Sequence, residues 1–356
     1  MVSTEQFKQT ILIVLGSGRW GGGEKNCVDL ITGLRGHFNF ILIHSPGDTI
    51  NRVLDKENIK HYEFPLHEPP SLNRIFNFIK LVKQLKPRLI HSHLNRANLY
   101  LSLAKPWLNS TWIASVHGFT SQLYNIFPDH LICVSHAIQK DLPKVFRKKS
   151  TLIYNGIKQM NQSPKISDSR NESVKSYENM QAFVLATIHP NKGQVFICEA
   201  LRNYDAGITV EFVGMGSQEH TQELLKFIGK SSNVKLDNQI IQDIQSYLDK
   251  ADFVIIPSYK EALSYVAIES LSAGTPVLAS RTGGLPEVVT EGVNGNFFTP
   301  GDISSFRLAL QQMKIDCNIF KQNLIEQPFL ENNEHFTLEF MLDKVHGLYK
   351  QLFKKK

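Results

Sequence analysis

The chain has 356 residues, a length typical of two ordinary domains, which excludes one small disulfide-stapled module. Hydrophobic residues make up 42% and charged residues 20% of it, close to the globular average, so disordered and collagen-like proteins are also excluded. The net charge is +6, but residues 1–157 hold 19 Lys and Arg against 10 Asp and Glu (+9) and the remainder 20 against 23 (−3), so the positive field belongs to the first half.

Short runs rich in Ile and Val alternate with amphipathic helical stretches along nearly the whole chain, a pattern typical of α/β proteins. In the first half the runs are continuously apolar, as strands covered by helices on both faces are. They predict strands at 11–16, 38–44, 60–64, 88–93, 112–117, 130–135 and 151–156.

The first expected strand leads into a glycine-rich turn that satisfies the spacing G-x-G-x-x-G through Gly16, Gly18 and Gly21. A dinucleotide fold also needs an acid at the end of the second strand, and His44 and Ser45 occupy that place, so no nicotinamide cofactor is expected. The turn either is a tight turn without a ligand or leads to a helix N-terminus whose N–H groups bind a phosphate or sugar oxygen.

A helix is expected between Ser71, as its N-cap, and Pro87, before which it should stop. Apolar residues at helical spacing predict that one face of this helix belongs to the core. This predicted core face consists of Leu72, Ile75, Phe76, Ile79 and Val82.

Basic residues cluster in the segment 140–149 and at the extreme C-terminus, 354–356. Such clusters are either solvated surface or a site of attraction to an anionic surface. No nucleic-acid-binding motif accompanies them, which favours a phospholipid surface over nucleic acid as the partner.

The N-terminal apolar run, 11–15, is too short for a signal peptide or a membrane span. The four cysteines form no C-x-x-C pair, so they predict buried free thiols in a reducing compartment. We therefore expect a cytoplasmic protein that is peripheral at the inner face of the membrane.

Residues 158–180 lose the apolar periodicity, which predicts a linker between a first domain, 1–157, and a second, 181–335. A second alternation of strands and helices then begins, so we expect two Rossmann-like domains of similar size. The remainder, 336–356, is expected to form a helix that packs back on the first domain, followed by a basic tail. Strands of the second half are predicted at 182–187, 208–214, 233–237, 252–258, 276–280 and 294–299.

The strongest motif follows the apolar strand that ends at Ile256. A loop with Glu261 leads into a helix predicted at 265–272, with Ser264 as its N-cap and Glu269 two turns further on. Ligands bind at the carboxyl ends of such strands, and the amides near Leu263 and Ser264 are a suitable seat for a diphosphate.

This stretch, DFVIIPSYKEALSYVAIESLSAGTPVLASRTGGLPEVV, resembles the donor-binding motif of family 4 glycosyltransferases, retaining enzymes of the GT-B fold. Earlier segments agree with the family in the same order, so the resemblance covers nearly the whole chain. They are GGGE (21–24), SVHG (115–118), CVS (133–135), IYNGI (153–157) and HPNKG (189–193).

The resemblance implies an N-terminal acceptor domain and a C-terminal domain for a UDP- or GDP-linked sugar. It implies that Glu261 binds the donor sugar, Glu269 the ribose, and Lys192 the leaving diphosphate, while His117 lies beneath the sugar ring. The implied catalytic residues are His117, Lys192 and Glu261, and the implied donor-binding residues are Gly22, Gly23, Asn155, Lys192, Leu263, Ser264 and Glu269.

Three positions depart from the family pattern. Thr187 stands where an arginine is common, Ala262-Leu263-Ser264 replace Gly-Phe-Gly after Glu261, and Lys158 stands where Asp often follows the Asn-Gly pair. No D-x-D motif occurs, so the sequence requires no divalent metal, and the nucleotide sugar is expected as a co-substrate with no further cofactor.

The expected function is metal-independent transfer of a hexose, with retention, to a lipid-linked or polysaccharide acceptor of the cell surface, as in lipopolysaccharide synthesis. Two alternatives stay open. One is a non-hydrolysing nucleotide-sugar epimerase, which would need acid/base carboxylates in the N-terminal domain, where Glu24 is the acid in a ligand-facing turn. The other is a catalytically weak sugar-nucleotide-binding protein, indicated by Thr187.

Overall fold

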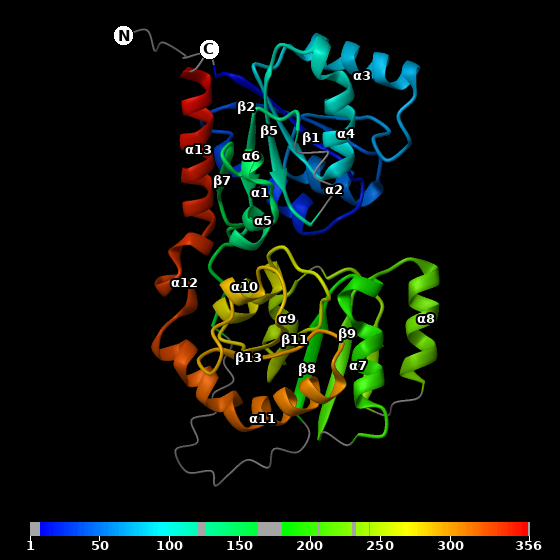
Figure 1. Ribbon diagram of the computed structural model, residues 1–356, viewed down its shortest axis with the longest axis vertical. Helices are drawn as coiled ribbons and strands as arrows, with labels where there is room; N and C mark the ends of the chain where they lie inside the picture. The colour runs from blue at the N-terminus through cyan, green and yellow to red at the C-terminus, as the bar shows by residue number, and fades with distance from the viewer. Residues whose placement is uncertain are drawn as a thin grey trace. The chain divides into compact units, whose positions relative to one another are not determined.

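The computed structural model describes residues 8–119, 126–162, 180–204, 207–229, 233–241 and 243–354. The chain forms two compact units. Unit 1 consists of Met1–Gly156 and Leu338–Lys356, and unit 2 of Ile157–Thr337, so the chain leaves the first unit and later returns to it (Figure 1). Most of the predicted linker and the last two residues of the basic tail lie outside the described residues.

Unit 1 contains a seven-stranded parallel sheet in the order β3-β2-β1-β4-β5-β6-β7. Its central strands are almost wholly buried, because helices cover both faces, as their continuous apolar sequence predicts. The strands are β1 (Thr10–Leu15), β2 (Asn39–His44), β3 (His61–Glu63), β4 (Leu89–His93), β5 (Thr111–Val116), β6 (His130–Cys133) and β7 (Ser150–Leu152). The helices are α1 (Gly22–Leu34), α2 (Asp48–Lys56), α3 (Leu72–Leu85), α4 (Asn95–Ala104), η1 (Lys105–Trp107), α5 (His136–Asp141), α6 (Lys144–Arg147) and α13 (Leu338–Lys354).

The C-terminal helix α13 belongs to unit 1 and packs against α1, as predicted. Its Tyr349 is fully buried, and the Tyr349 hydroxyl lies 2.6 Å from Nδ1 of His91 on β4. The other ring nitrogen of His91 lies 2.8 Å from Ser115 Oγ on β5. A hydrogen-bonded chain therefore fixes the last helix to the centre of the first sheet.

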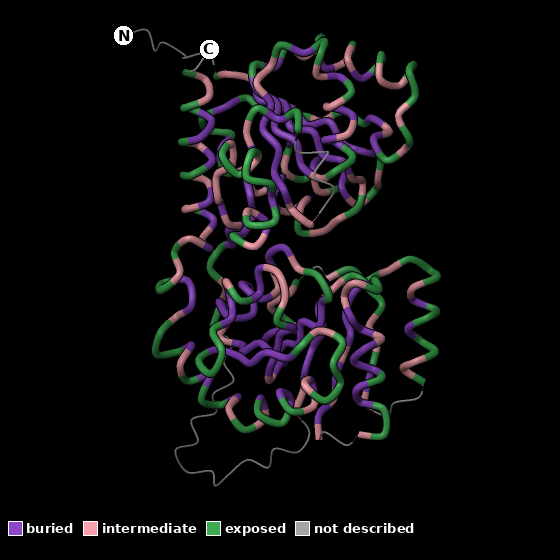
Figure 2. The backbone as a smooth tube through the Cα atoms, in the orientation of Figure 1, coloured by how far each residue is buried: buried purple, intermediate pink, exposed green. Residues whose placement is uncertain are grey.

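Helix α3 begins after Ser71, whose hydroxyl accepts a hydrogen bond from Arg74 N, and it ends before Pro87, as predicted. The predicted core face is wrong for two of its members. Leu72 is 89% exposed and Phe76 is 66% exposed, whereas the helix buries Phe78 and Val82. Along α3, exposed and intermediate positions outnumber buried ones (Figure 2). The buried face is thus rotated away from the predicted one.

Unit 2 contains a six-stranded parallel sheet in the order β10-β9-β8-β11-β12-β13. The strands are β8 (Met180–Leu185), β9 (Ile208–Val213), β10 (Val234–Asp237), β11 (Phe253–Ile256), β12 (Val277–Ser280) and β13 (Gly295–Phe298). The helices are η3 (Pro190–Lys192), α7 (Gln194–Leu201), α8 (Gln218–Ile228), α9 (Gln245–Leu248), α10 (Tyr265–Ser272), η4 (Leu285–Glu287), α11 (Ile303–Glu326), α12 (Phe329–Asn332) and η5 (Glu334–Phe336).

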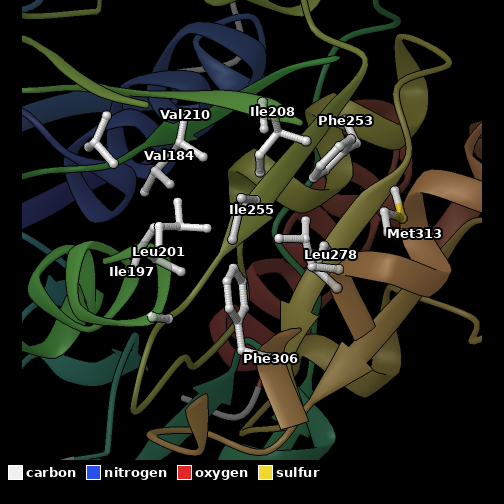
Figure 3. Packing of buried hydrophobic residues seen from close by; sticks show 14 of the residues in the cluster. Val184, Ile197, Leu201, Ile208, Val210, Phe253, Ile255, Leu278, Phe306 and Met313 are labelled. Atoms are coloured by element: carbon white, nitrogen blue, oxygen red, sulfur yellow. The ribbon is translucent and has the colours of Figure 1, made fainter. Parts of the chain in front are cut away.

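The core of unit 2 lies between this sheet and the helices α7 and α11. Ile255 and Leu278 from the sheet meet Ile197 of α7 and Phe306 of α11 (Figure 3). Both units are therefore Rossmann-like α/β domains, as the sequence predicts. The four cysteines are free and buried, also as predicted.

Among the described residues, no helix is both long and apolar enough to cross a bilayer.

Candidate functional site

The motif residues of unit 2 lie in two loops at the carboxyl ends of β8 and β11, which are neighbours in the sheet. The strand order reverses here, because the chain runs from β8 to β9 and β10 on one side and then returns to β11 on the other. In open α/β sheets, ligands bind in the crevice at this point.

Backbone contacts hold the two loops together. The side-chain amide of Asn191 donates to Lys260 O at 2.8 Å, and Tyr259 N donates to Asn191 O at 2.9 Å. Gly193 has φ +71°, and a Cβ there would lie 2.2 Å from Pro257 O. Only glycine allows this approach, so the sequence HPNKG positions Lys192 beside the loop that follows β11.

Lys192 and Glu261 form an ion pair across the two loops, with Nζ and Oε2 2.8 Å apart. The hydroxyl of Ser258 donates to the same carboxylate oxygen at 3.0 Å. Ser258 is held in turn, because Ser280 Oγ on β12 donates to Ser258 O at 2.6 Å. A cation and a carboxylate are thus fixed side by side at the crevice.

Helix α10 begins directly after this loop. Ser264 is its N-cap, as predicted, and its hydroxyl accepts a hydrogen bond from Ala267 N at 3.2 Å. Glu269 is buried on the second turn of the helix. The first-turn amides and the positive end of the helix dipole favour an anion beside Ser264.

A cavity of about 230 Å³ borders the loop that carries Lys192. Its lining includes His189, Gly193 and Gln194 from this loop and the start of α7, Glu223 from α8, and Tyr259 from the loop after β11. The Lys192 loop therefore adjoins a cavity that is lined by both polar and aromatic side chains.

In unit 1, the glycine-rich turn follows β1 and His117 follows β5, so both lie at carboxyl ends of strands that flank β4 in the sheet. Helix α1 begins at Gly22, and a Cβ on Gly23 would lie 2.9 Å from the Leu94 side chain that follows β4. The ring of His117 lies beyond β5, with Nε2 2.9 Å from Nδ1 of His93. Burial lowers the pKa of His117 to about 4, so its imidazole is neutral at pH 7.

The predicted site residues are divided between the units. Lys192, Glu261, Leu263, Ser264 and Glu269 lie in unit 2, and Gly22, Gly23, His117 and Asn155 lie in unit 1. Asn155 is buried, and its side-chain oxygen accepts a hydrogen bond from Asn26 Nδ2 at 3.0 Å. Its observed contact is with helix α1.

Two further residues of the site were not predicted. His93 contacts His117, and Ser258 contacts Glu261. Each ends or follows a buried apolar strand, where ligand-facing residues of open α/β sheets are expected, whereas the prediction of His117 rests on the family resemblance. Within the ranges that the structure describes, no group of three or more His, Cys, Asp or Glu side chains is placed to hold a metal ion.

Two family models match the chain. Residues 20–159 match the model described as Glycosyltransferase Family 4, and residues 180–316 match the one described as Glycosyl transferases group 1. The chain belongs to glycosyltransferase family 4. The two matched segments correspond to the two units that carry the candidate site.

Solved structures of other glycosyltransferases and of a sucrose-phosphate synthase share the fold. HepE of Anabaena, solved in complex with UDP and glucose, is 20% identical, with a TM-score of 0.80 over 96% of this chain and 100% of that chain. Sucrose-phosphate synthase of Thermosynechococcus elongatus is 18% identical, with a TM-score of 0.79 over 98% of this chain and 100% of that chain. The fold is therefore GT-B.

Curated relatives match over shorter ranges. An uncharacterized glycosyltransferase of Methanocaldococcus jannaschii is 24% identical over 63% of this chain and 60% of its own length. D-inositol 3-phosphate glycosyltransferase of Corynebacterium diphtheriae is 33% identical over 37% of this chain and 30% of its own length. The chain thus spans less than two thirds of the length of these family members.

Proposed function

We propose that the chain is a retaining, metal-independent hexosyltransferase that moves a sugar from a UDP- or GDP-linked donor to a glycan or lipid-linked acceptor. The observation that carries the proposal is the ion pair of Lys192 and Glu261 at the point of unit 2 where the strand order reverses. This pair presents a cation for a diphosphate and a carboxylate for sugar hydroxyls within one hydrogen-bond length of each other.

The proposed role of Lys192 follows from where charge develops. Negative charge grows on the diphosphate as the glycosidic bond breaks, so a positioned ammonium stabilises the transition state more than the ground state. Thr187 supplies no second cation, which concentrates this role on Lys192 and on the first-turn amides of α10. These groups take the place of a divalent metal in the proposal.

The other assignments divide the donor between two carboxylates. Glu261 accepts hydrogen bonds from hydroxyls of the transferred sugar, and Glu269 on α10 accepts them from the ribose. In unit 1, the neutral imidazole of His117 contacts the sugar or the departing phosphate. The glycine-rich turn at Gly22 and Gly23 brings backbone N–H groups to the same donor.

Two solved relatives guide the choice of substrates. HepE was solved with UDP-glucose, and WaaG is described as a glycosyltransferase involved in lipopolysaccharide biosynthesis. UDP-glucose is therefore the first donor to test, and a lipid-linked cell-surface glycan the first acceptor class. The proposed place of action is the cytoplasmic face of the membrane, where both are accessible.

The test begins with thermal unfolding in the presence of UDP, GDP or ADP, because a ligand that binds the folded state raises the melting temperature. The matching nucleotide sugar is then supplied with lipid-linked glycan acceptors, and the product is examined by proton NMR. We expect an anomeric configuration equal to that of the donor, and equal rates with and without EDTA. An inverted product contradicts retention, and loss of activity in EDTA contradicts metal independence.

Neither alternative is favoured. An epimerase would convert the donor in the absence of any acceptor, and a weak binding protein would bind nucleotide without transferring sugar. The same assay separates both from a transferase, because each predicts no acceptor-dependent product.

A further inference from the structure

Helix α3 presents apolar side chains to solvent. Leu72 and Phe76 are 89% and 66% exposed, and they lie one turn apart on the outer side of the helix. Lys80 and Lys83 follow on the same side over the next two turns, and both are exposed. These four residues are called the α3 face below.

Basic residues predominate around the α3 face, although Glu68, just before the helix, forms an ion pair with Arg74. Residues 71–88 contain five basic residues, Arg74, Lys80, Lys83, Lys86 and Arg88, and no acidic residue. Within the described part of the chain, the ammonium groups of Lys80 and Lys83 form no ion pair. An apolar end followed by lysines is the arrangement by which amphipathic helices bind anionic bilayers.

A second exposed aromatic residue belongs to the neighbouring segment. Trp107 in η1 is 56% exposed, and α4, which precedes η1, packs against α3 (Figure 1). Ser110 Oγ donates to Pro87 O at 2.6 Å, so the chain just after Trp107 lies beside the end of α3. Tryptophan is enriched at the bilayer surface, where one part of its ring is apolar and the other polar.

The basic segment 140–149, by contrast, is partly engaged with its own backbone. The guanidinium of Arg147 donates to Lys140 O and Leu142 O, at 2.6 and 3.0 Å. The ammonium of Lys149 donates to Ile126 O and Pro128 O, at 2.8 and 2.6 Å. Two cations are engaged in the segment 71–88 as well, because Arg74 forms an ion pair with Glu68 and Arg88 donates to Phe353 O. The choice of α3 therefore rests on Leu72 and Phe76, two large exposed apolar side chains one turn apart.

We propose that the α3 face docks on an anionic phospholipid bilayer, with Leu72 and Phe76 entering the headgroup region and Lys80 and Lys83 binding lipid phosphates. The charge disfavours a second copy of the chain as the occupant, because two predominantly basic faces repel each other. This inference rests on the proposed function in one respect, the lipid-linked acceptor. It assigns the membrane contact to α3 rather than to the segment 140–149.

The experiment is flotation of the full chain with vesicles of phosphatidylcholine, with and without phosphatidylglycerol, at low and high salt. We expect wild type to bind the anionic vesicles, and less so at high salt. The variant Leu72→Ser/Phe76→Ser should bind about tenfold more weakly at both salt concentrations, because it loses apolar burial. Lys80→Ser/Lys83→Ser should lose most of the salt dependence.

Two controls match these variants. Val145→Ser removes a comparably exposed apolar side chain from α6 of the same unit, and Arg147→Ser/Lys148→Ser/Lys149→Ser removes cations from the segment 140–149. Both should bind nearly as wild type does. The substituted α3 side chains are exposed, so the α3 variants should keep the wild-type melting temperature.

Three results overturn the proposal: wild type ignores anionic vesicles, the Leu72/Phe76 variant binds as well as wild type, or the α3 face mediates self-association in sedimentation velocity. Slow release of nucleotide from a nucleotide sugar to water is measured in parallel, and the α3 variants should retain it. If wild type binds the membrane but releases nucleotide from no donor, the proposed function is contradicted and this inference stands. If wild type releases nucleotide but does not bind the membrane, this inference is contradicted and the proposed function stands.

Discussion

Lys192 and Glu261 neutralise each other in the ligand-free chain, so a bound diphosphate must compete with the carboxylate for the ammonium. We expect Lys192→Ala to cost about 2 to 4 kcal/mol of transition-state stabilisation, the scale of one preorganised electrostatic group. The measurement is kcat/KM for sugar transfer. Lys260→Ala, directly before Glu261 and with its side chain exposed, is the matched control and should retain activity. A Lys192→Ala enzyme with more than about a third of the wild-type rate contradicts the role.

Three histidines at the ends of β4 and β5 make stability depend on pH. Burial lowers the pKa of His117 to about 4 and that of His91 to about 3, and it holds the pKa of His93 well below its usual range. The unfolded chain therefore binds protons below about pH 6.5 that the folded chain does not. We expect the free energy of unfolding to fall from about pH 6.5 towards pH 4, by up to about 1.4 kcal/mol per pH unit for each histidine that stays neutral.

Urea unfolding at several pH values between these limits measures that slope. His117→Asn removes one titrating group and keeps a polar side chain beside His93, so its slope should be smaller than that of wild type. Equal slopes would show that His117 becomes protonated without cost in the folded chain.

At the scale of elements, the attachment of α13 depends on a buried hydrogen bond. Tyr349→Phe leaves Nδ1 of His91 without the hydroxyl that lies 2.6 Å away, and an unsatisfied buried group costs about 1 to 3 kcal/mol. We expect this loss in the free energy of unfolding, measured in urea. Tyr62→Phe removes a hydroxyl from an exposed tyrosine of β3 and should change stability little. If the free energy of unfolding of Tyr349→Phe equals that of wild type, the hydrogen bond does not stabilise the attachment of α13.

Elements with one possible burial pattern could be predicted from the sequence. Most strands of both sheets are short and apolar, and α10 has a clear N-cap at Ser264, so their observed bounds agree with the predicted ones within two residues. The exception is β7, which was predicted at 151–156 and is observed at Ser150–Leu152. Helix α3 differs, because apolar residues occupy more than half of its circumference. Periodicity alone could not decide which of them face the core, and Phe78 was missed while Leu72 and Phe76 were misplaced.

The candidate site could be predicted only in part from the local pattern. Glu261 follows a buried strand and could be identified there, whereas the prediction of Lys192 rests on the family resemblance of the segment HPNKG. Their contact joins residues 69 positions apart and depends on β8 and β11 being neighbours, which the linear pattern does not contain. Ser258 and His93 were missed for the same reason, because their roles are contacts with partners on other strands.

On the scale of the whole molecule, the positive charge and the exposed apolar helix belong to the same unit. The first segment of unit 1 carries the whole +9 of residues 1–157, and unit 2 supplies the ion pair at the proposed donor site. The α3 face and the Lys192–Glu261 pair therefore belong to different units, which lets the variants of α3 and of Lys192 be interpreted independently.

The return of α13 to unit 1 also bears on how the protein is made. Because α13 follows all of unit 2 in the chain, a ribosome completes the second domain before it releases the helix that finishes the first. Until then, the side of α1 that α13 covers, with buried residues such as Leu30 and Leu34, has no partner to pack against. A nascent chain therefore carries an open hydrophobic groove through most of its synthesis, and this groove is where a chaperone that binds apolar surface would engage it.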